Sequence, residues 1–242
     1  VLSAGEQHGR SKEVLRAVEE TYDVVVCGGG LAGFCAAVAA AREGASVCLV
    51  HDRPVLGGNS SSEIRVPPQG AASFHAYARE TGIIHELLVE ERAINHTDPT
   101  GDNGWTNSVW DLVLYDMAVR TPNLTVHLNT AATGVMMRDE RTVEAVVARV
   151  GGADTELKLR GRVFVDCTGD GTVAALAGCE WRMGTEGRDE FGEPHAPERA
   201  SADVMGSSIH FRARDMGRPV PFKAPEWAVK YDDPDFFYKQ GR

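Results

Sequence analysis

The stretch Asp23-Val-Val-Val-Cys-Gly-Gly-Gly-Leu-Ala-Gly33 decides the fold, because an apolar run leads directly into closely spaced glycines. The β-branched residues of 22–27 are typical of a strand that is buried on both faces. The residues that follow predict a helix over 31–43, ended by Gly44. A second apolar strand is predicted at 46–50. Strand, glycine turn, helix and strand together match the length of one βαβ unit.

The glycines form the pattern G-x-G-x-x-G, which between a strand and a helix is the fingerprint of a dinucleotide-binding turn. Gly28 permits the tight turn, Gly30 lets the backbone approach a pyrophosphate, and Gly33 lets the helix pack closely on the strand. Leu31 and Ala32 open the helix, whose free N–H groups and positive dipole end favour phosphate. A plain glycine-rich loop is the alternative, but the flanking strand and helix argue against it. We therefore predict that these five residues bind the ADP half of a dinucleotide cofactor.

The end of the second strand departs from the fingerprint, which expects an acidic residue there to bind the ribose hydroxyls. His51 occupies that position and Asp52 follows it. A neutral imidazole makes one ribose hydrogen bond, whereas a carboxylate accepts two. Asp52 takes the ribose role if the strand ends at Val50. Alternatively, His51 and Arg53 bind a 2′-phosphate, which would mean NADP. A solvated strand end is the third interpretation.

Three segments give the chain a resemblance to a known family. They are 24–33, 51–65 (His-Asp-Arg-Pro-Val-Leu-Gly-Gly-Asn-Ser-Ser-Ser-Glu-Ile-Arg) and 163–171 (Val-Phe-Val-Asp-Cys-Thr-Gly-Asp-Gly). On these residues the chain resembles FAD-dependent oxidoreductases of the glutathione-reductase-like, two-dinucleotide-binding type. Among them it is most similar to a bacterial group of FAD-dependent oxidoreductases. The likeness covers most of residues 20–215 and implies FAD, ahead of NADP, as the cofactor.

The resemblance implies a role for the segment after the second strand. In that family it runs along the cofactor towards the flavin, and here it is 53–60. Gly57 and Gly58 would allow close backbone approach to the pyrophosphate and ribityl chain, while Asn59 and Ser60 offer hydrogen bonds. A serine-rich surface loop is the alternative.

Four further cofactor residues are implied by the same resemblance. It places the backbone near Ala132 against the adenine. Thr168, Gly169 and Asp170 follow a predicted strand and resemble the family's second glycine motif, which lies near the pyrophosphate. A glycine turn at the carboxyl end of a buried strand is where α/β sheets bind ligands. A simple hairpin turn is the alternative.

The predicted fold class is α/β, a Rossmann-like FAD/NAD(P)-binding domain with a central parallel sheet and an inserted antiparallel meander, plus the start of a second domain. Further helices are predicted at 74–93, 108–120 and 173–178, and further strands at 124–128, 132–138, 143–150, 155–159, 163–167 and 207–213. We expect a polar lead-in at 1–20, helical over 11–19. The FAD-binding domain is predicted at 21–180, and an incomplete substrate domain at 181–242.

Composition narrows the partners. The chain has 242 residues, with 35 acidic against 25 basic ones and a formal net charge of −10, which argues against a nucleic-acid partner. No apolar run reaches the roughly 18 residues needed to cross a bilayer, so we expect no membrane partner. The 5 cysteines form no C-x-x-C pair, so neither a metal site nor a disulfide framework is predicted. A cytoplasmic location is the default expectation.

Function is predicted at the level of reaction class. We expect an FAD-dependent oxidoreductase that acts on an unidentified small molecule, with the flavin performing the hydride or electron transfer. The alternatives are a non-catalytic or incomplete dinucleotide-binding module, and an NADP-binding protein. No catalytic residue can be assigned, since His75 and Arg79, four residues apart, more often form a solvated or paired helix face. We also expect the chain to be the N-terminal part of a longer protein, with an open flavin-ring site and weak FAD binding.

Overall fold

The computed structural model describes residues 16–68, 81–95, 108–205, 214–229 and 235. Contacts divide the chain into two units, 1–204 and 205–242, and the fold described below is that of the first. The predicted strand at 207–213 and the beginning of the predicted helix at 74–93 lie outside the described residues. The predicted domain boundary at residue 180 stays a prediction.

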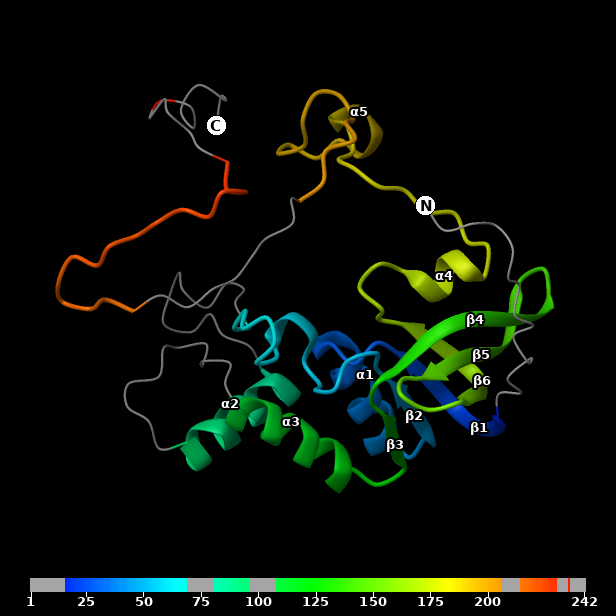
Figure 1. The fold of residues 1–242 in the computed structure, drawn as a ribbon. Coiled ribbons are helices and arrows are strands. Elements are labelled where there is room, and N and C mark those ends of the chain that lie inside the picture. Colours follow the sequence, from blue (N-terminus) through cyan, green and yellow to red (C-terminus); the bar gives the residue numbers. More distant parts are fainter. Residues whose placement is uncertain (1–15, 69–80, 96–107, 206–213, 230–234, 236–242) are drawn as a thin grey trace, which may run out of the picture. The chain divides into compact units, whose positions relative to one another are not determined.

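The βαβ unit predicted from the glycine motif is confirmed (Figure 1). Strand β1 (Arg16–Cys27) leads through the glycines into helix α1 (Leu31–Arg42), and β2 (Val47–Val50) lies parallel to β1. In the structure β2 ends at Val50. This is the strand end that the sequence analysis required for Asp52 to bind the ribose. The buried pattern of β2, in which all four residues are buried, is that of a strand covered on both faces.

Six strands form one sheet in the part of the chain that the structure describes, in the order β3-β2-β1-β6-β5-β4. The remaining strands are β3 (Leu124–His127), β4 (Thr130–Asp139), β5 (Thr142–Val150) and β6 (Thr155–Asp166). Strands β3, β2, β1 and β6 are parallel, and they end level because Cys27 pairs with both Val50 and Asp166, and Val50 pairs with His127. Their carboxyl ends therefore meet along one edge of the sheet, where α/β proteins bind ligands.

The antiparallel meander is also confirmed, but it is continuous with the parallel sheet rather than separate from it. Strand β5 pairs antiparallel with β4 and with β6, while β6 pairs parallel with β1 along its whole length. The two strands predicted at 155–159 and 163–167 are therefore one strand. Gly161 does not interrupt it, since this residue pairs in register with Tyr22 of β1.

The helix predicted at 11–19 is wrong where it can be compared, because Arg16 and the residues after it belong to β1. Arg16 pairs with Thr155, and the ladder continues to the end of both strands. Glu19 also forms ion pairs with Lys158, at 3.3 Å, and with Arg160. Pairing with a strand about 140 residues away overrides the local helix preference of a polar segment.

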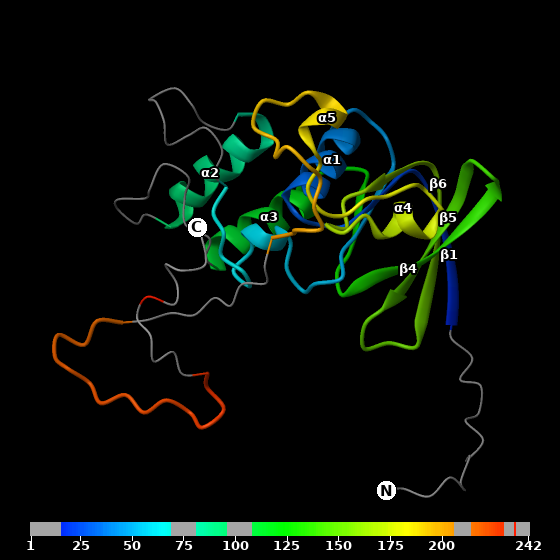
Figure 2. The same cartoon turned by 90° about the horizontal axis from the view of Figure 1, so that it is seen from above.

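Helices cover one face of the parallel strands (Figures 1 and 2). Two hydrophobic cores lie on the two faces of these strands. The first packs Val26 and Leu49 of the sheet against α1, α2 (Gly82–Asn95) and α3 (Ser108–Arg120). The second groups Val25 and Val50 with buried residues of β5 and β6. Packing on both faces holds the parallel strands, and with them their carboxyl ends, in place.

Shorter elements complete the first unit. They are the 3-10 turn η1 (Gly58–Ser60), helix α4 (Thr172–Leu176) and helix α5 (Arg188–Phe191). Helix α4 confirms the short helix predicted after the last strand of the sheet. Among the described residues, no helix is long and apolar enough to span a membrane.

Candidate dinucleotide site

The glycine turn has the conformation that its predicted roles require. Gly28 has φ +102°, and a Cβ atom there would lie 2.0 Å from the carbonyl oxygen of Cys167. A Cβ on Gly33 would lie 1.9 Å from the carbonyl oxygen of Gly28, so the helix reaches the strand only because this residue is glycine. Gly30 differs, because its Cβ would meet nothing within 4 Å. Packing within the chain therefore accounts for two of the three glycines and leaves Gly30 facing open space.

Helix α1 begins at this open space with its N-terminus free of protein anions. Gly30 is the N-cap residue, no side chain caps the helix, and its first turn contains no acidic residue. The unpaired N–H groups and the positive end of the helix dipole are therefore available to a ligand anion.

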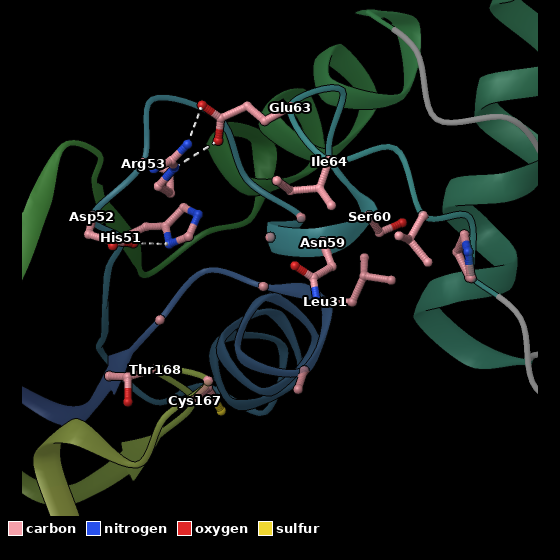
Figure 3. Close-up of a pocket in the computed structure, with 18 of the residues that line it drawn as sticks. Leu31, His51, Asp52, Arg53, Asn59, Ser60, Glu63, Ile64, Cys167 and Thr168 are labelled. Carbon is pink, nitrogen blue, oxygen red and sulfur yellow. Dashed lines mark hydrogen bonds and ion pairs between the residues drawn. The ribbon is translucent and has the colours of Figure 1, made fainter. Parts of the chain in front are cut away.

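A cleft of about 590 Å³ lies in front of this turn, and Figure 3 shows the side chains around it. Its walls come from the start of α1, the segment after β2, and the residues after β6. Most of the predicted cofactor residues line it: Gly28, Gly30, Leu31, Ala32, His51, Asp52, Arg53, Gly57, Gly58, Asn59, Ser60, Thr168 and Gly169. Segments more than 100 residues apart in the sequence thus form a single cleft.

A second, smaller cavity of about 150 Å³ contains the remaining predicted residues except Gly33, which packs behind the turn. Ala132 and Asp170 line this cavity. It shares Gly28, Asp52 and Thr168 with the larger cleft, so the two cavities adjoin. The structure therefore brings together every region that the sequence assigned to the cofactor.

His51 and Asp52 follow the end of β2 and differ in burial, although an oxygen of the Asp52 carboxylate lies 3.4 Å from the His51 Nδ1 atom (Figure 3). The His51 side chain is buried, and its Nδ1 atom accepts a hydrogen bond from the backbone N–H of Gly29 at 3.0 Å. Burial lowers the pKa of His51, against an opposing effect of the Asp52 carboxylate, so the ring is held neutral. Asp52 has a side chain that is 63% exposed and lies at the cleft. The exposed Asp52 carboxylate is therefore accessible to a ligand, and the buried Nε2 atom of His51 has no hydrogen-bond partner among the described residues.

Arg53 also lines the cleft, but it is already paired (Figure 3). Its Nε and Nη2 atoms donate to the two carboxylate oxygens of Glu63 at 2.9 and 3.0 Å. A bidentate arginine–carboxylate pair satisfies the fork geometry that a phosphate would otherwise use. Glu63 was not predicted from the sequence, and its contact with Arg53 argues against the 2′-phosphate interpretation.

The segment after β2 is fastened to the glycine turn. The backbone N–H of Gly57 donates to the carbonyl oxygen of Gly29 at 2.8 Å, and a Cβ on Gly58 would lie 3.0 Å from the Cα of Gly30. Ser60 is 5% exposed, and its Oγ atom has no hydrogen-bond partner among the described residues. A buried hydroxyl without a partner at the wall of a cleft is expected to bind a ligand.

Asp166, at the end of β6, is a structural residue that the sequence analysis missed. Its Oδ1 atom accepts from the N–H and Oγ1 of Thr168, at 3.0 and 2.7 Å, and its Oδ2 atom accepts from the N–H of Ala174 at 2.8 Å. Burial by itself would raise the pKa of Asp166, but these hydrogen bonds outweigh it and lower the pKa. The signal for this role was an acidic residue two positions before Thr168, the spacing of an Asx-turn.

The structure assigns no catalytic residue. His75 and Arg79, which were considered for that role, lie outside the described residues. Among the described residues no group of three or more His, Cys, Asp or Glu side chains is arranged to hold a metal ion, and the described cysteines are free thiols. Burial raises the pKa of Cys27 to about 12, so this thiol is not a nucleophile.

The fold and the cleft together define a Rossmann-like dinucleotide-binding protein. A comparison with protein families gives the more specific assignment, because the model of the family described as FAD dependent oxidoreductase matches residues 23–240. The chain belongs to this family, and FAD is its cofactor. The finer glutathione-reductase-like label stays a resemblance.

Curated relatives match over short segments. The fumarate reductase (cytochrome) of Shewanella frigidimarina is 44% identical over 57 residues, which are 24% of this chain and 10% of that protein. The NADH:fumarate oxidoreductase of Klebsiella pneumoniae is 52% identical over 44 residues, which are 18% of this chain and 5% of that protein. The chain therefore matches only a small part of the length of these relatives.

Solved structures resemble the chain at low identity. THI4 of Thermovibrio ammonificans is 17% identical with a TM-score of 0.47, covering 74% of this chain and 76% of that one. A geranylgeranyl bacteriochlorophyll reductase-like protein of Thermoplasma acidophilum is 18% identical with a TM-score of 0.45, covering 67% and 43%.

Proposed function

We propose that this chain binds FAD in the cleft at the carboxyl edge of its parallel sheet and serves a redox reaction on a small molecule. The observation that carries the proposal is the open space at Gly30, where α1 presents uncapped N–H groups and a Cβ would meet nothing within 4 Å. When bound, FAD supplies hydride or electron transfer. The identity of the substrate and of the electron acceptor would be set by residues outside this cleft.

Each wall of the cleft has a proposed role in holding FAD. The N–H groups of Leu31 and Ala32 at the start of α1 bind the pyrophosphate. Asp52 accepts hydrogen bonds from the ribose hydroxyls, because its carboxylate is exposed directly after β2. The unpartnered hydroxyl of Ser60 and the amide of Asn59 bind further along the cofactor.

The remaining residues shape and border the site. Gly28 and Gly33 shape the turn, and Gly57 and Gly58 hold the next segment against it. Thr168 and Gly169 border the pyrophosphate region, while Ala132 and Asp170 line the smaller cavity, which we assign to the adenine. His51 and Arg53 support the site through Gly29 and Glu63.

An NADP-binding protein is less well supported. The two groups proposed for a 2′-phosphate are a buried His51 with a lowered pKa and an Arg53 that is paired with Glu63. Two carboxylates, Asp52 and Glu63, line the same cleft and would repel an additional phosphate. We expect the protein to work in the cytoplasm, in line with the free cysteines of its described part.

The visible absorption spectrum tests the proposal. FAD titrated into the purified protein is expected to show the shifted absorption bands of bound flavin, and these bands are expected to bleach on anaerobic reduction. Flavin bands that stay unshifted at every FAD concentration would favour a non-catalytic or incomplete dinucleotide-binding module. Tight NADP binding without FAD binding would favour an NADP-binding protein.

A further inference from the structure

The segment Gly57–Val66, here called the cleft loop, lines the candidate site and contains one strained residue. Gly57 and Gly58 have φ of +108° and +57°, which glycine adopts without strain, but Arg65, which carries a side chain, has φ +66°. A left-handed conformation at such a residue persists only where surrounding contacts hold it. The cleft loop therefore depends on contacts beyond its own sequence.

Hydrogen bonds within the cleft loop account for part of its shape. The N–H of Val66 donates to the carbonyl oxygen of Asn59 at 2.9 Å, and the N–H of Arg65 donates to that of Ser61 at 2.8 Å. The Nε atom of Arg65 donates to the carbonyl oxygen of Ser62 at 2.9 Å. These bonds close the loop on itself, but none of them fixes it to the rest of the fold.

The Gly57 N–H fixes one end of the loop to Gly29, Glu63 pairs with Arg53, and Asp111 supplies a further anchor from a distant helix. Its Oδ1 atom accepts a hydrogen bond from the backbone N–H of Ser62 at 2.9 Å, and its Oδ2 atom accepts one from the Ser62 hydroxyl. Both oxygens of one carboxylate are therefore directed at a single residue in the middle of the cleft loop.

Helix α3 holds Asp111 in place. Asp111 lies in the first turn of α3, between residues that bury this helix in the first core: Trp110 is 1% exposed and Leu114 is fully buried. Leu114 also packs beneath the cleft loop, since a Cβ on Gly57 would lie 3.2 Å from its Cδ1 atom. The carboxylate that meets Ser62 thus comes from a firmly packed element.

We propose that Asp111 is a positioning residue for the cofactor, which keeps the cleft loop in the form that lines the site. Neither Asp111 nor Ser62 is among the residues that line the cleft, so the effect passes through the backbone of the loop. The proposal rests on the proposed function, because it concerns how that site is held ready for FAD.

The physical reason is preorganisation. Without the carboxylate, the N–H of Ser62 loses its partner and the cleft loop populates other conformations. The apparent affinity for FAD then falls by the fraction of molecules in which the loop has its binding form. A purely structural support would behave differently, since it would lower the unfolding temperature and leave the affinity of the folded protein unchanged.

The test compares FAD dissociation constants, measured by flavin fluorescence well below the unfolding temperature of each variant. Asp111→Ala is expected to bind FAD about tenfold more weakly, since it removes two hydrogen bonds to a carboxylate. The FAD affinity of Asp111→Asn is expected to lie between those of Asp111→Ala and the native protein, because the amide oxygen still accepts a hydrogen bond from Ser62. Asp116→Ala is the matched control. Asp116 lies on the same helix and pairs with Arg120 at 2.6 Å, so it is expected to leave FAD affinity unchanged.

A second pair of variants keeps the test decisive if Asp111→Ala does not fold. Ser62→Ala removes one of the two hydrogen bonds and is expected to weaken FAD binding. The double variant Asp111→Asn/Ser62→Ala is expected to weaken FAD binding by a larger factor. Limited proteolysis of the same proteins is expected to cut the cleft loop faster in the Asp111 variants than in Asp116→Ala.

Two results would overturn the proposal, and they differ. If the native chain binds FAD and folded Asp111 and Ser62 variants bind it equally well, the positioning role is wrong while the proposed function stands. If the native chain itself binds no FAD, the proposed function is wrong and the positioning role falls with it.

Discussion

The Nδ1 atom of His51 accepts a hydrogen bond of 3.0 Å from the backbone N–H of Gly29. His51 thus links the end of β2 to the glycine turn after β1. The same contact explains why Gly29 is a glycine, since a Cβ there would lie 2.8 Å from the His51 Cγ atom. The residue at the position where the fingerprint expects a ribose ligand thus supports the turn through its Nδ1 atom, and the ribose role is proposed for the exposed Asp52 carboxylate.

The first prediction separates these two neighbours. Asp52→Ala is expected to weaken FAD binding by about 10- to 100-fold, because a charged acceptor of the ribose hydroxyls is lost. Its unfolding temperature should change little, since the side chain is 63% exposed. His51→Ala is expected to destabilise the fold by about 2 kcal/mol, because it opens a cavity and leaves the Gly29 N–H unpaired. FAD titration beside thermal unfolding measures both. Equal loss of affinity in two equally stable variants would show that the roles are not divided.

The second prediction concerns pH. Because burial lowers the pKa of His51 in the folded protein, the unfolded chain binds this proton more readily. Stability from His51 should therefore be complete above its ordinary pKa of about 6.5 and decline as the pH falls below that value. His51→Asn is the control, since its amide oxygen can accept from Gly29 but does not titrate. The free energy of unfolding between pH 5 and pH 8 is the measurement, and identical pH profiles for the two proteins would contradict the account.

The third prediction concerns Asp166, which organises the turn after β6. Asp166→Ala should cost about 2 kcal/mol of stability and weaken FAD binding, because Thr168 loses its hydrogen-bond partner. The folded pKa of Asp166 is lowered, so its contribution is present above the unfolded value of about 3.8 and is lost as the pH falls through the folded pKa. Denaturant unfolding at pH 7 and pH 3 would measure this. If the native protein and the variant differ in free energy of unfolding by the same amount at both pH values, the proposed role of the Asp166 carboxylate is wrong.

The fourth prediction tests the selection against a 2′-phosphate. Native protein should bind ADP more tightly than 2′,5′-ADP, because Arg53 is paired and two carboxylates face the ligand. Glu63→Gln should raise the relative affinity for 2′,5′-ADP by about threefold, a modest gain because the ion pair is partly exposed. Adding Arg53→Ala should remove that gain. A native preference for 2′,5′-ADP would revive the NADP interpretation.

The parts of the fold that the sequence predicted are those encoded by local pattern. The glycine spacing and the apolar strands placed the βαβ unit correctly, because strand, glycine turn, helix and second strand follow one another directly along the chain. The helix predicted at 11–19 failed over its described part because that segment pairs with β6, far along the chain. No local signal predicts such a contact.

In the candidate site, too, residues placed by local pattern were predicted, while contacts between distant residues were missed. Its lining residues were predicted because they follow strand ends, which meet at one edge of a parallel sheet. The inward turn of His51 was missed because the fingerprint gives a position and not a side-chain direction. Glu63 and Asp111 were missed because each acts on a residue outside its own turn or helix. Gly29, the glycine that the fingerprint does not require, was the one sequence signal that a side chain such as His51 packs against the turn.

The central claim is that the open space at Gly30 holds the pyrophosphate of FAD, and Gly30→Val tests it most directly. Gly30 has φ −61° and ψ 174°, which valine adopts readily, and its Cβ would meet no protein atom within 4 Å. The variant should therefore fold normally, as judged by circular dichroism and thermal unfolding. Ala39→Val, at an exposed position of α1, is the matched control. We predict that Gly30→Val binds FAD at least about a hundredfold more weakly than both the native protein and Ala39→Val. A folded Gly30→Val protein with native FAD affinity would contradict the account.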